Sequence, residues 1–217
     1  NYSTKGIKTT ASSKILENYT PIYNATAVEK LNSHDTIIVG KASMDELAMG
    51  GTNKSALTGP VSNPWNTTCI SGGSSGGSAA IVGSGVVPFA LGSDTGDSIR
   101  KPAGFCGVVG FKPTWGRISR FGVVPYASSL DTLGAFTRNV EDMAIVIEAM
   151  CGRDDRDMTS SNRPTEAYYA NLKSDVSNLK IAVLKNVYDE ISNPDVKEGI
   201  DRCIEVYQKL GATVDFV

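Results

Sequence analysis

The sequence predicts an α/β fold whose sheet carries helices on both faces. Three observations support this prediction: 41% of the 217 residues are hydrophobic, short apolar runs alternate with segments of helical spacing, and the final third follows the order strand, helix, strand. Such alternation is typical of a sheet against which the connecting helices pack. A chain of this length and composition buries an ordinary hydrophobic core.

The first half of the chain is expected to form two helices and two strands. Residues 24–32 space their apolar side chains along one helical face, and a β-branched run at 36–39 follows as a strand. Small residues at 78–82 indicate a helix that opens directly after a glycine-rich turn. The apolar run at 86–91 indicates a buried strand that leads into a second polar turn.

The second half continues the same alternation of helical spacing and short β-branched runs. Its expected elements are a strand at 108–111, a helix at 140–150, a polar loop at 153–164, and a β-α-β unit at 181–184, 194–210 and 212–217. We found no internal repeat, and the polar loop does not by itself mark a domain boundary.

The composition gives no electrostatic footprint for nucleic acid or for a membrane surface. The chain has 21 Lys and Arg residues against 23 Asp and Glu residues, a formal net charge of -2, whereas nucleic-acid-binding domains concentrate basic residues. Any contact with RNA would therefore come through a partner. No apolar run approaches the roughly 20 residues that span a bilayer. We expect a cytoplasmic protein, organellar if the source is eukaryotic, without membrane contact.

The cysteines and the histidine favour neither a disulfide framework nor a metal site. Cys69, Cys106, Cys151 and Cys203 lie far apart without a C-x-x-C pair, and His34 is the only histidine. We therefore expect reduced thiols and no metal in this chain. Because His34 lies in a polar turn, a Ser-His-Asp triad is not expected either.

Two serines, Ser74 and Ser98, are the strongest candidates for chemistry. Ser74 lies in the run Ser-Gly-Gly-Ser-Ser-Gly-Gly-Ser at 71–78, and Ser98 ends the run Gly-Ser-Asp-Thr-Gly-Asp-Ser at 92–98. A hydroxyl is a weak nucleophile until a base removes its proton, and glycine permits close backbone approach to a reacting carbonyl. Taken alone, the first run could be a flexible linker and the second an ordinary turn. Their places at the starts of helices favour catalysis, because backbone N–H groups there can converge on an oxyanion.

Ser98 also begins the pattern S-x-x-K at 98–101, which acylates in penicillin-binding proteins. The S-D-N and K-T-G elements that accompany it there do not follow in order. We set this interpretation aside.

Several ordered motifs resemble one family. They include Met-Asp-Glu-Leu-Ala-Met-Gly at 44–50, Gly-Gly-Ser-Ser-Gly-Gly-Ser-Ala at 72–79, Gly-Ser-Asp-Thr-Gly at 92–96, Gly-Arg-Ile-Ser-Arg-Phe-Gly at 116–122 and Ser-Ser-Leu-Asp at 128–131. Together they resemble the amidase signature family and, within it, the A subunits of tRNA-dependent amidotransferases. The resemblance implies an α/β/α sandwich with a central mixed sheet, in which residues 1–217 are part of a single amidase domain truncated at both ends.

The resemblance also implies a Ser-cisSer-Lys triad. It places the nucleophile on Ser98 and the bridging serine, preceded by a cis peptide bond, on Ser74. The backbone N–H groups of Thr95, Gly96, Asp97 and Ser98 would then form the oxyanion hole. Asp97 stands where the family usually has glycine, and a carboxylate aimed at the oxyanion would oppose the tetrahedral intermediate.

The substrate pocket and the base follow from the same resemblance. Met49 and Gly50 are expected to line the pocket. The triad lysine belongs to a Lys-Asp-Asn motif just upstream of Asn1, so the chain is expected to begin just after the catalytic base and to be inactive alone. Lys41, Lys101 and Lys112 do not match the position of that lysine.

The implied activity is that of a glutaminase that supplies ammonia for conversion of Glu-tRNA(Gln) to Gln-tRNA(Gln). The implied partners are the amidotransferase B and C subunits, with tRNA bound through a partner only. The complex would use ATP and Mg²⁺, and the chain described here would hold no cofactor. A stand-alone amidase acting on small molecules and a non-catalytic scaffold paralogue remain the alternatives.

Overall fold

A three-stranded antiparallel sheet organises the larger of the two units into which the chain divides, Asn1–Ala170 and Asn171–Val217. The structure is a computed structural model and describes residues 1–173 and 175–217. The sheet has the strand order β1-β3-β2, with β1 at Phe89–Asp94, β2 at Val109–Phe111 and β3 at Thr132–Thr137. The placement of residues 1–217 in a single domain stays a prediction.

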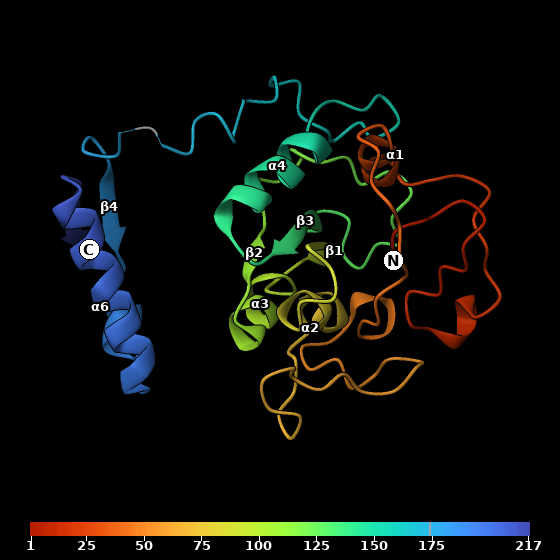
Figure 1. Ribbon diagram of the computed structural model, residues 1–217, viewed down its shortest axis with the longest axis horizontal. Coiled ribbons are helices and arrows are strands. Elements are labelled where there is room, and N and C mark those ends of the chain that lie inside the picture. Colours follow the sequence, from red (N-terminus) through yellow and green to blue (C-terminus); the bar gives the residue numbers. More distant parts are fainter. Residues whose placement is uncertain (174) are drawn as a thin grey trace. The chain divides into compact units, whose positions relative to one another are not determined.

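Helices cover both faces of this sheet, which confirms the predicted α/β fold (Figure 1). Helices α1 (Thr26–Asn32) and α4 (Val140–Met150) contribute to a cluster on one face, and α2 (Gly76–Gly83) and α3 (Arg100–Cys106) to a cluster on the other. The central strand β3 is buried along its whole length. Its side chains alternate between the two clusters, as the pleat of a strand requires.

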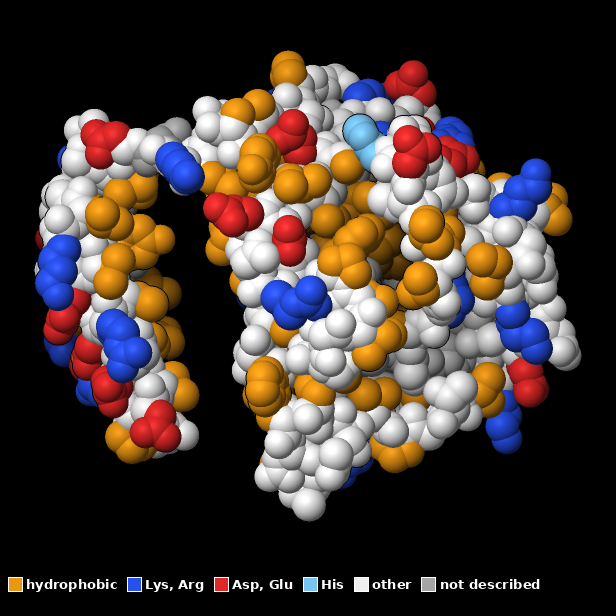
Figure 2. All heavy atoms as spheres, in the orientation of Figure 1, with side chains coloured by type: hydrophobic (Ala, Val, Ile, Leu, Met, Phe, Trp, Pro, Cys, Tyr) orange, Lys and Arg blue, Asp and Glu red, His pale blue; other side chains and the backbone are white. Residues whose placement is uncertain are grey.

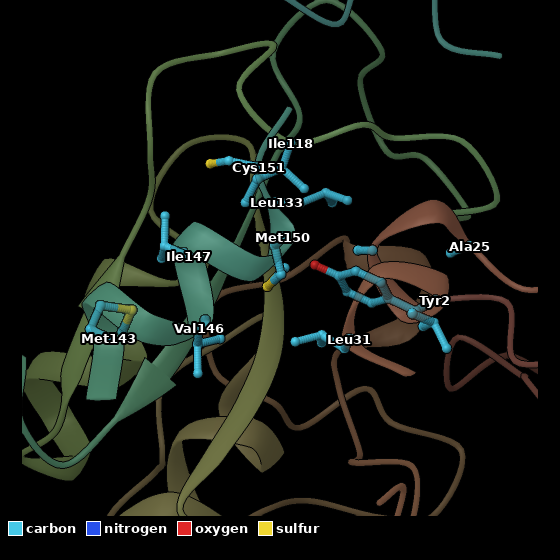
Figure 3. Close-up of a cluster of buried hydrophobic side chains, with 13 residues drawn as sticks. Tyr2, Ala25, Leu31, Ile118, Leu133, Met143, Val146, Ile147, Met150 and Cys151 are labelled. Carbon is cyan, nitrogen blue, oxygen red and sulfur yellow. The ribbon is translucent and has the colours of Figure 1, made fainter. Parts of the chain in front are cut away.

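The first cluster joins α4, α1 and the start of the chain (Figure 3). Asn139 caps the start of α4, where its side chain accepts from the N–H of Asp142 at 2.7 Å. The helix buries Met143, Ile147 and Met150 at helical spacing. Figure 3 shows Tyr2 pointing toward Met150. The Tyr2 hydroxyl donates to the carbonyl of Gly92 at 2.6 Å, which attaches the first residues to β1.

The second cluster fixes the place of the turn that follows β1. Ile99, the first residue after Ser98, is fully buried against Phe136 of β3 and Val82 of α2 in this cluster. Close approach of α3 to the sheet needs Gly110, because a Cβ there would lie 2.4 Å from the Cβ of Ala103. The residue next to Ser98 is therefore held by core packing on three elements.

The smaller unit is the β-α-β arrangement that the sequence predicts. Strand β4 (Lys180–Val183) pairs in parallel with β5 (Thr213–Phe216), and α5 (Lys185–Asp189) and α6 (Pro194–Lys209) connect them. The Asn193 side chain caps α6 by accepting from two N–H groups of its first turn. Figure 2 shows orange apolar side chains along one side of this unit and charged side chains along the other.

Two strand predictions needed correction. The run at 36–39 forms no strand in the described structure, and Ile37 and Val39 are 85% and 73% exposed. High β-propensity does not make a strand without a neighbouring backbone to accept its hydrogen bonds. The strand predicted at 86–91 begins later, at Phe89, because pairing with β3 runs from Phe89↔Thr137 to Asp94↔Thr132.

The structure also describes the state of the cysteines and the lengths of the helices. All four cysteines are free within the described residues. Across residues 1–173 and 175–217, no helix has the length and apolar character needed to cross a membrane.

A buried carboxylate ties the loop after α4 to α1. Asp154 accepts from the hydroxyls of Ser119, at 2.7 Å, and of Thr26, and it also accepts from Arg156 Nε at 3.1 Å. Burial alone would raise the pKa of the Asp154 carboxyl, but these hydrogen bonds outweigh it and hold the pKa well below its usual range. The charged form of Asp154 therefore stabilises the folded state.

We expect Asp154→Asn to lower the free energy of unfolding of the complete gene product at pH 7 by roughly 1–3 kcal/mol. The pKa of Asp154 is lower in the folded state, so its contribution is complete above the unfolded pKa of about 4 and is lost as the pH falls below it. Urea unfolding at pH 7 and at about pH 2.5, well below the unfolded pKa of about 4, measures this loss. Asp155→Asn is the matched control because the Asp155 side chain is 93% exposed. Equal losses for both variants, or a loss independent of pH, would contradict the prediction.

Candidate active site

The glycine-rich turn places Ser74 in the interior. The peptide bond between Gly73 and Ser74 is cis, as the resemblance predicted, and Ser74 is fully buried. A Cβ on Gly73 would lie 2.1 Å from Asp45 Oδ2 and 2.8 Å from the backbone nitrogens of Thr52 and Asn53. Only glycine fits at this position, because a side chain there would overlap backbone that cannot move away.

Asp45 joins this turn to the loop that carries Met49 and Gly50. The Asp45 N–H donates to the Ser74 carbonyl at 3.0 Å. Its buried carboxylate accepts from three backbone N–H groups at 2.8–3.3 Å, those of residues 52, 53 and 55. A Cβ on Gly50 would lie 2.4 Å from Asp45 Cγ, so the loop closes tightly over this carboxylate. The structure therefore holds the predicted pocket residues beside the Ser74 turn, with Met49 51% exposed.

A second buried carboxylate shapes the turn that carries Ser98. Asp94 is fully buried at the end of β1, and its Oδ2 accepts from the N–H groups of Ile99 and Arg100 at 2.9 and 3.3 Å. Arg100 also forms an ion pair with it, with 3.1 Å between Nη2 and Oδ1. These contacts bend the chain from β1 into α3 and leave Ser98 on the turn, 6% exposed.

Four successive backbone N–H groups on this turn have no acceptor among the described residues. In the part of the chain that the structure describes, neither a side chain nor a loop carbonyl accepts from the N–H of Thr95, Gly96, Asp97 or Ser98. Asp131, which is not part of this turn, stabilises it by accepting from Thr95 Oγ1 at 2.6 Å. Unpaired N–H groups beside a candidate nucleophile such as Ser98 are suited to stabilise a developing oxyanion.

The two serine turns meet through their backbones. The N–H of Ser75 donates to the carbonyl of Ser98 at 3.2 Å, and Ser75 Oγ both accepts from the Ser93 N–H and donates to the Ser93 carbonyl, each at 3.2 Å. The hydroxyls of Ser74 and Ser98 are not hydrogen bonded to each other, because Ser74 Oγ has no partner among the described residues. An unpaired buried hydroxyl costs free energy, of order 1–3 kcal/mol.

No lysine of the described residues bonds to Ser74. The ammonium of Lys41 donates to the Tyr2 carbonyl and, at 2.9 Å, to Thr4 Oγ1, and desolvation lowers the pKa of Lys41 to about 8. Lys101 pairs with Asp97 at 2.7 Å, and Lys112 donates to a neighbouring carbonyl. The structure therefore brings the Ser98 turn, the Ser74 turn and the loop that carries Met49 and Gly50 together, and Ser74 Oγ has no partner among the described residues.

A cavity of about 360 Å³ lies next to this group of loops. It is lined by Ser93 and Asp131, which contact the Ser75 and Thr95 side chains, and by Arg120 and Met158, among others. Neither Ser74 nor Ser98 lines it. No group of three or more metal-ligating side chains occurs among residues 1–173 and 175–217.

The chain matches known proteins over its whole length. The sequence profile described as Amidase matches residues 1–217. The A subunit of glutamyl-tRNA(Gln) amidotransferase from Sulfurihydrogenibium sp. (strain YO3AOP1) is 51% identical over 213 residues, 98% of this chain and 44% of that protein. The protein of the same name from Listeria welshimeri is 51% identical over 217 residues, 100% of this chain and 45% of that protein.

Solved structures agree with the sequence comparisons. The A subunit of glutamyl-tRNA(Gln) amidotransferase from Thermotoga maritima superposes with a TM-score of 0.95 at 44% identity, over 100% of this chain and 48% of that one. The peptide amidase of Stenotrophomonas maltophilia superposes with a TM-score of 0.90 at 31% identity, over 100% of this chain and 46% of that one. The chain thus spans about half the length of these relatives. The profile match, the identities and the superpositions together confirm that the chain belongs to the amidase signature family.

Proposed function

We propose that this chain carries the nucleophile and the bridging serine of a glutaminase that serves a tRNA-dependent amidotransferase. One observation carries the proposal: Ser98 lies on a turn whose four N–H groups have no described acceptor, beside a turn that buries the unpaired hydroxyl of Ser74. The relatives named as A subunits of glutamyl-tRNA(Gln) amidotransferase support this choice of reaction.

In the first half of the reaction, Ser98 Oγ attacks the side-chain amide carbon of glutamine. The proton of Ser98 passes to Ser74, and Ser74 passes its own proton to the base, which the resemblance places in a Lys-Asp-Asn motif just upstream of Asn1. The amide oxygen gains negative charge, and the N–H groups of the Thr95–Ser98 turn donate to it. The base returns a proton through Ser74 to the leaving nitrogen, so that ammonia departs and a γ-glutamyl ester remains on Ser98.

In the second half, water attacks the ester along the same proton path and glutamate is released. Ammonia is then the product that a B subunit uses to amidate activated Glu-tRNA(Gln), and the C subunit is a further partner. ATP and Mg²⁺ belong to that step and to the partner. The near-balanced charge of this chain, 21 basic against 23 acidic residues, agrees with a role in which tRNA is bound through a partner.

The experiment compares ammonia sources. We would co-express the complete gene product with amidotransferase B and C subunits and measure both ammonia release from glutamine and formation of Gln-tRNA(Gln). Glutamine is expected to support both reactions, whereas ammonium chloride should support tRNA amidation without glutamine.

The two alternative functions, a stand-alone amidase and a non-catalytic scaffold, predict different results in this experiment. A stand-alone amidase would hydrolyse simple amides at full rate without the partners and would not support tRNA amidation with glutamine. A scaffold would release no ammonia from glutamine in any combination, and only ammonium chloride would then support amidation.

A further inference from the structure

The pair formed by Asp97 and Lys101 lies at the edge of the candidate active site. Asp97 directly precedes Ser98, and its own N–H is one of the four that have no described acceptor. The Asp97 carboxylate lies 2.7 Å from the ammonium of Lys101, and the Asp97 carbonyl accepts from the Lys101 N–H at 2.8 Å. Lys101 is thus attached to this residue by both its side chain and its backbone.

Lys101 also contacts the loop that carries the predicted pocket residues. A Cβ on Gly51 would lie 2.8 Å from Lys101 Nζ, so the ammonium rests against the backbone of Gly51. This loop is itself fixed by Asp45, which accepts from the N–H of Thr52 at 3.2 Å. The ammonium therefore lies between the nucleophile turn and the pocket loop.

The neighbouring cation, Arg100, is paired with a different carboxylate. Arg100 forms an ion pair with the buried Asp94 and donates to the Gly96 carbonyl. Lys101 is the cation that pairs with Asp97 among the salt bridges of the described residues. Without Lys101, the Asp97 carboxylate would lose its ion-pair partner, on a residue whose own N–H belongs to the candidate oxyanion hole.

We propose that Lys101 is a positioning residue, which turns the Asp97 carboxylate away from the oxyanion and neutralises its charge during acylation of Ser98. The proposal rests on Ser98 as the nucleophile of the proposed function but not on glutamine as its substrate. As a surface ion pair, with Asp97 48% and Lys101 32% exposed, it contributes little to folding stability. Its effect lies in the transition state, where a like charge without its partner, on the residue next to Ser98, slows the reaction.

The test measures the rate at which a neutral fluorophosphonate labels Ser98 in the complete gene product, with its partners where they are needed for solubility. Attack of Ser98 Oγ on the phosphorus of this reagent also develops negative charge on an oxygen. We expect Lys101→Gln to lower the labelling rate and the kcat for glutamine by about tenfold, roughly the effect of one like charge near the site, with much less change in KM. Salt should partly restore the rate of this variant, because ions screen a half-exposed carboxylate.

Second-site variants separate charge from packing. Lys101→Arg should keep the wild-type rate, and the double variant Asp97→Asn/Lys101→Gln should recover most of what Lys101→Gln loses, because the uncompensated charge is then removed. Lys14→Gln is the control, since Lys14 is an exposed lysine in an N-terminal 3₁₀ turn. Equal unfolding midpoints of wild type and Lys101→Gln would show that the rate change is not a loss of folding.

The outcomes distinguish the two proposals. Wild-type protein that labels at Ser98 but does not hydrolyse glutamine overturns the proposed function alone. Unchanged labelling of Lys101→Gln, or a double variant as slow as the single one, overturns the role of Lys101 alone. Wild-type protein that does not label at Ser98 overturns both.

Discussion

Replacing Ser98 by alanine is expected to lower glutamine hydrolysis by at least about 10³-fold. The other hydroxyl on this turn, Thr95 Oγ1, donates to Asp131 at 2.6 Å and so is not free to replace the Ser98 hydroxyl. The fold should tolerate the change, since no hydrogen bond of the described structure uses Ser98 Oγ. The measurement is ammonia release from glutamine by the complex, together with mass spectrometry of the enzyme after rapid acid quenching. A γ-glutamyl ester should appear on the peptide that contains Ser98 in the wild type and be missing in the variant.

The matched control is Ser84→Ala at the end of α2. Its hydroxyl is exposed and donates to the Ile81 carbonyl at 3.1 Å, outside the Ser98 turn. Full activity of Ser84→Ala beside the loss in Ser98→Ala would attribute the effect to the nucleophile. Retention of more than about a tenth of the activity by Ser98→Ala would exclude Ser98 from that role, because removal of a true nucleophile costs far more.

Local features of the site could be predicted from the sequence. The glycine pairs around Ser74 and the Asp-Thr-Gly-Asp-Ser turn are contiguous, and their chemistry depends on neighbours within a few residues. The cis bond before Ser74 was predicted from the resemblance and is present. The Asp97–Lys101 ion pair spans one helical turn, a spacing that sequence could also have suggested.

Features that depend on distant residues could not be predicted. Strand β3 contains Gly134, whose lack of a side chain is required because a Cβ would lie 2.0 Å from the Phe111 carbonyl oxygen of β2. No local pattern reports such a contact, and β3 went unpredicted. The supporting roles of Asp45, Asp94 and Asp131 were missed for the same reason. Each lies within a family motif, but only the folded chain shows which N–H groups they accept from.

Two adjacent serines should respond in opposite ways to the same substitution. Ser74→Ala is expected to lower glutamine hydrolysis by roughly 10²–10⁴-fold, the range for loss of a positioned proton-transfer group. The free energy of unfolding should stay the same or rise by up to about 3 kcal/mol, because the substitution removes an unpaired buried hydroxyl. The structural reason is that Ser74 Oγ is buried without a partner among the described residues, so alanine removes no hydrogen bond there.

Ser75→Ala is the matched variant because the two residues share the same turn and the same burial but differ in bonding. Ser75 Oγ makes two hydrogen bonds to the backbone of Ser93, and their loss should lower the free energy of unfolding by roughly 1–3 kcal/mol. Urea unfolding and glutaminase rates of the two variants, measured in parallel, separate a proton relay from a structural serine. An active Ser74→Ala enzyme would remove the relay from the mechanism. Destabilisation by Ser74→Ala equal to that by Ser75→Ala would instead show that the Ser74 hydroxyl is held by a structural bond, and its place beside Ser98 would then need no catalytic explanation.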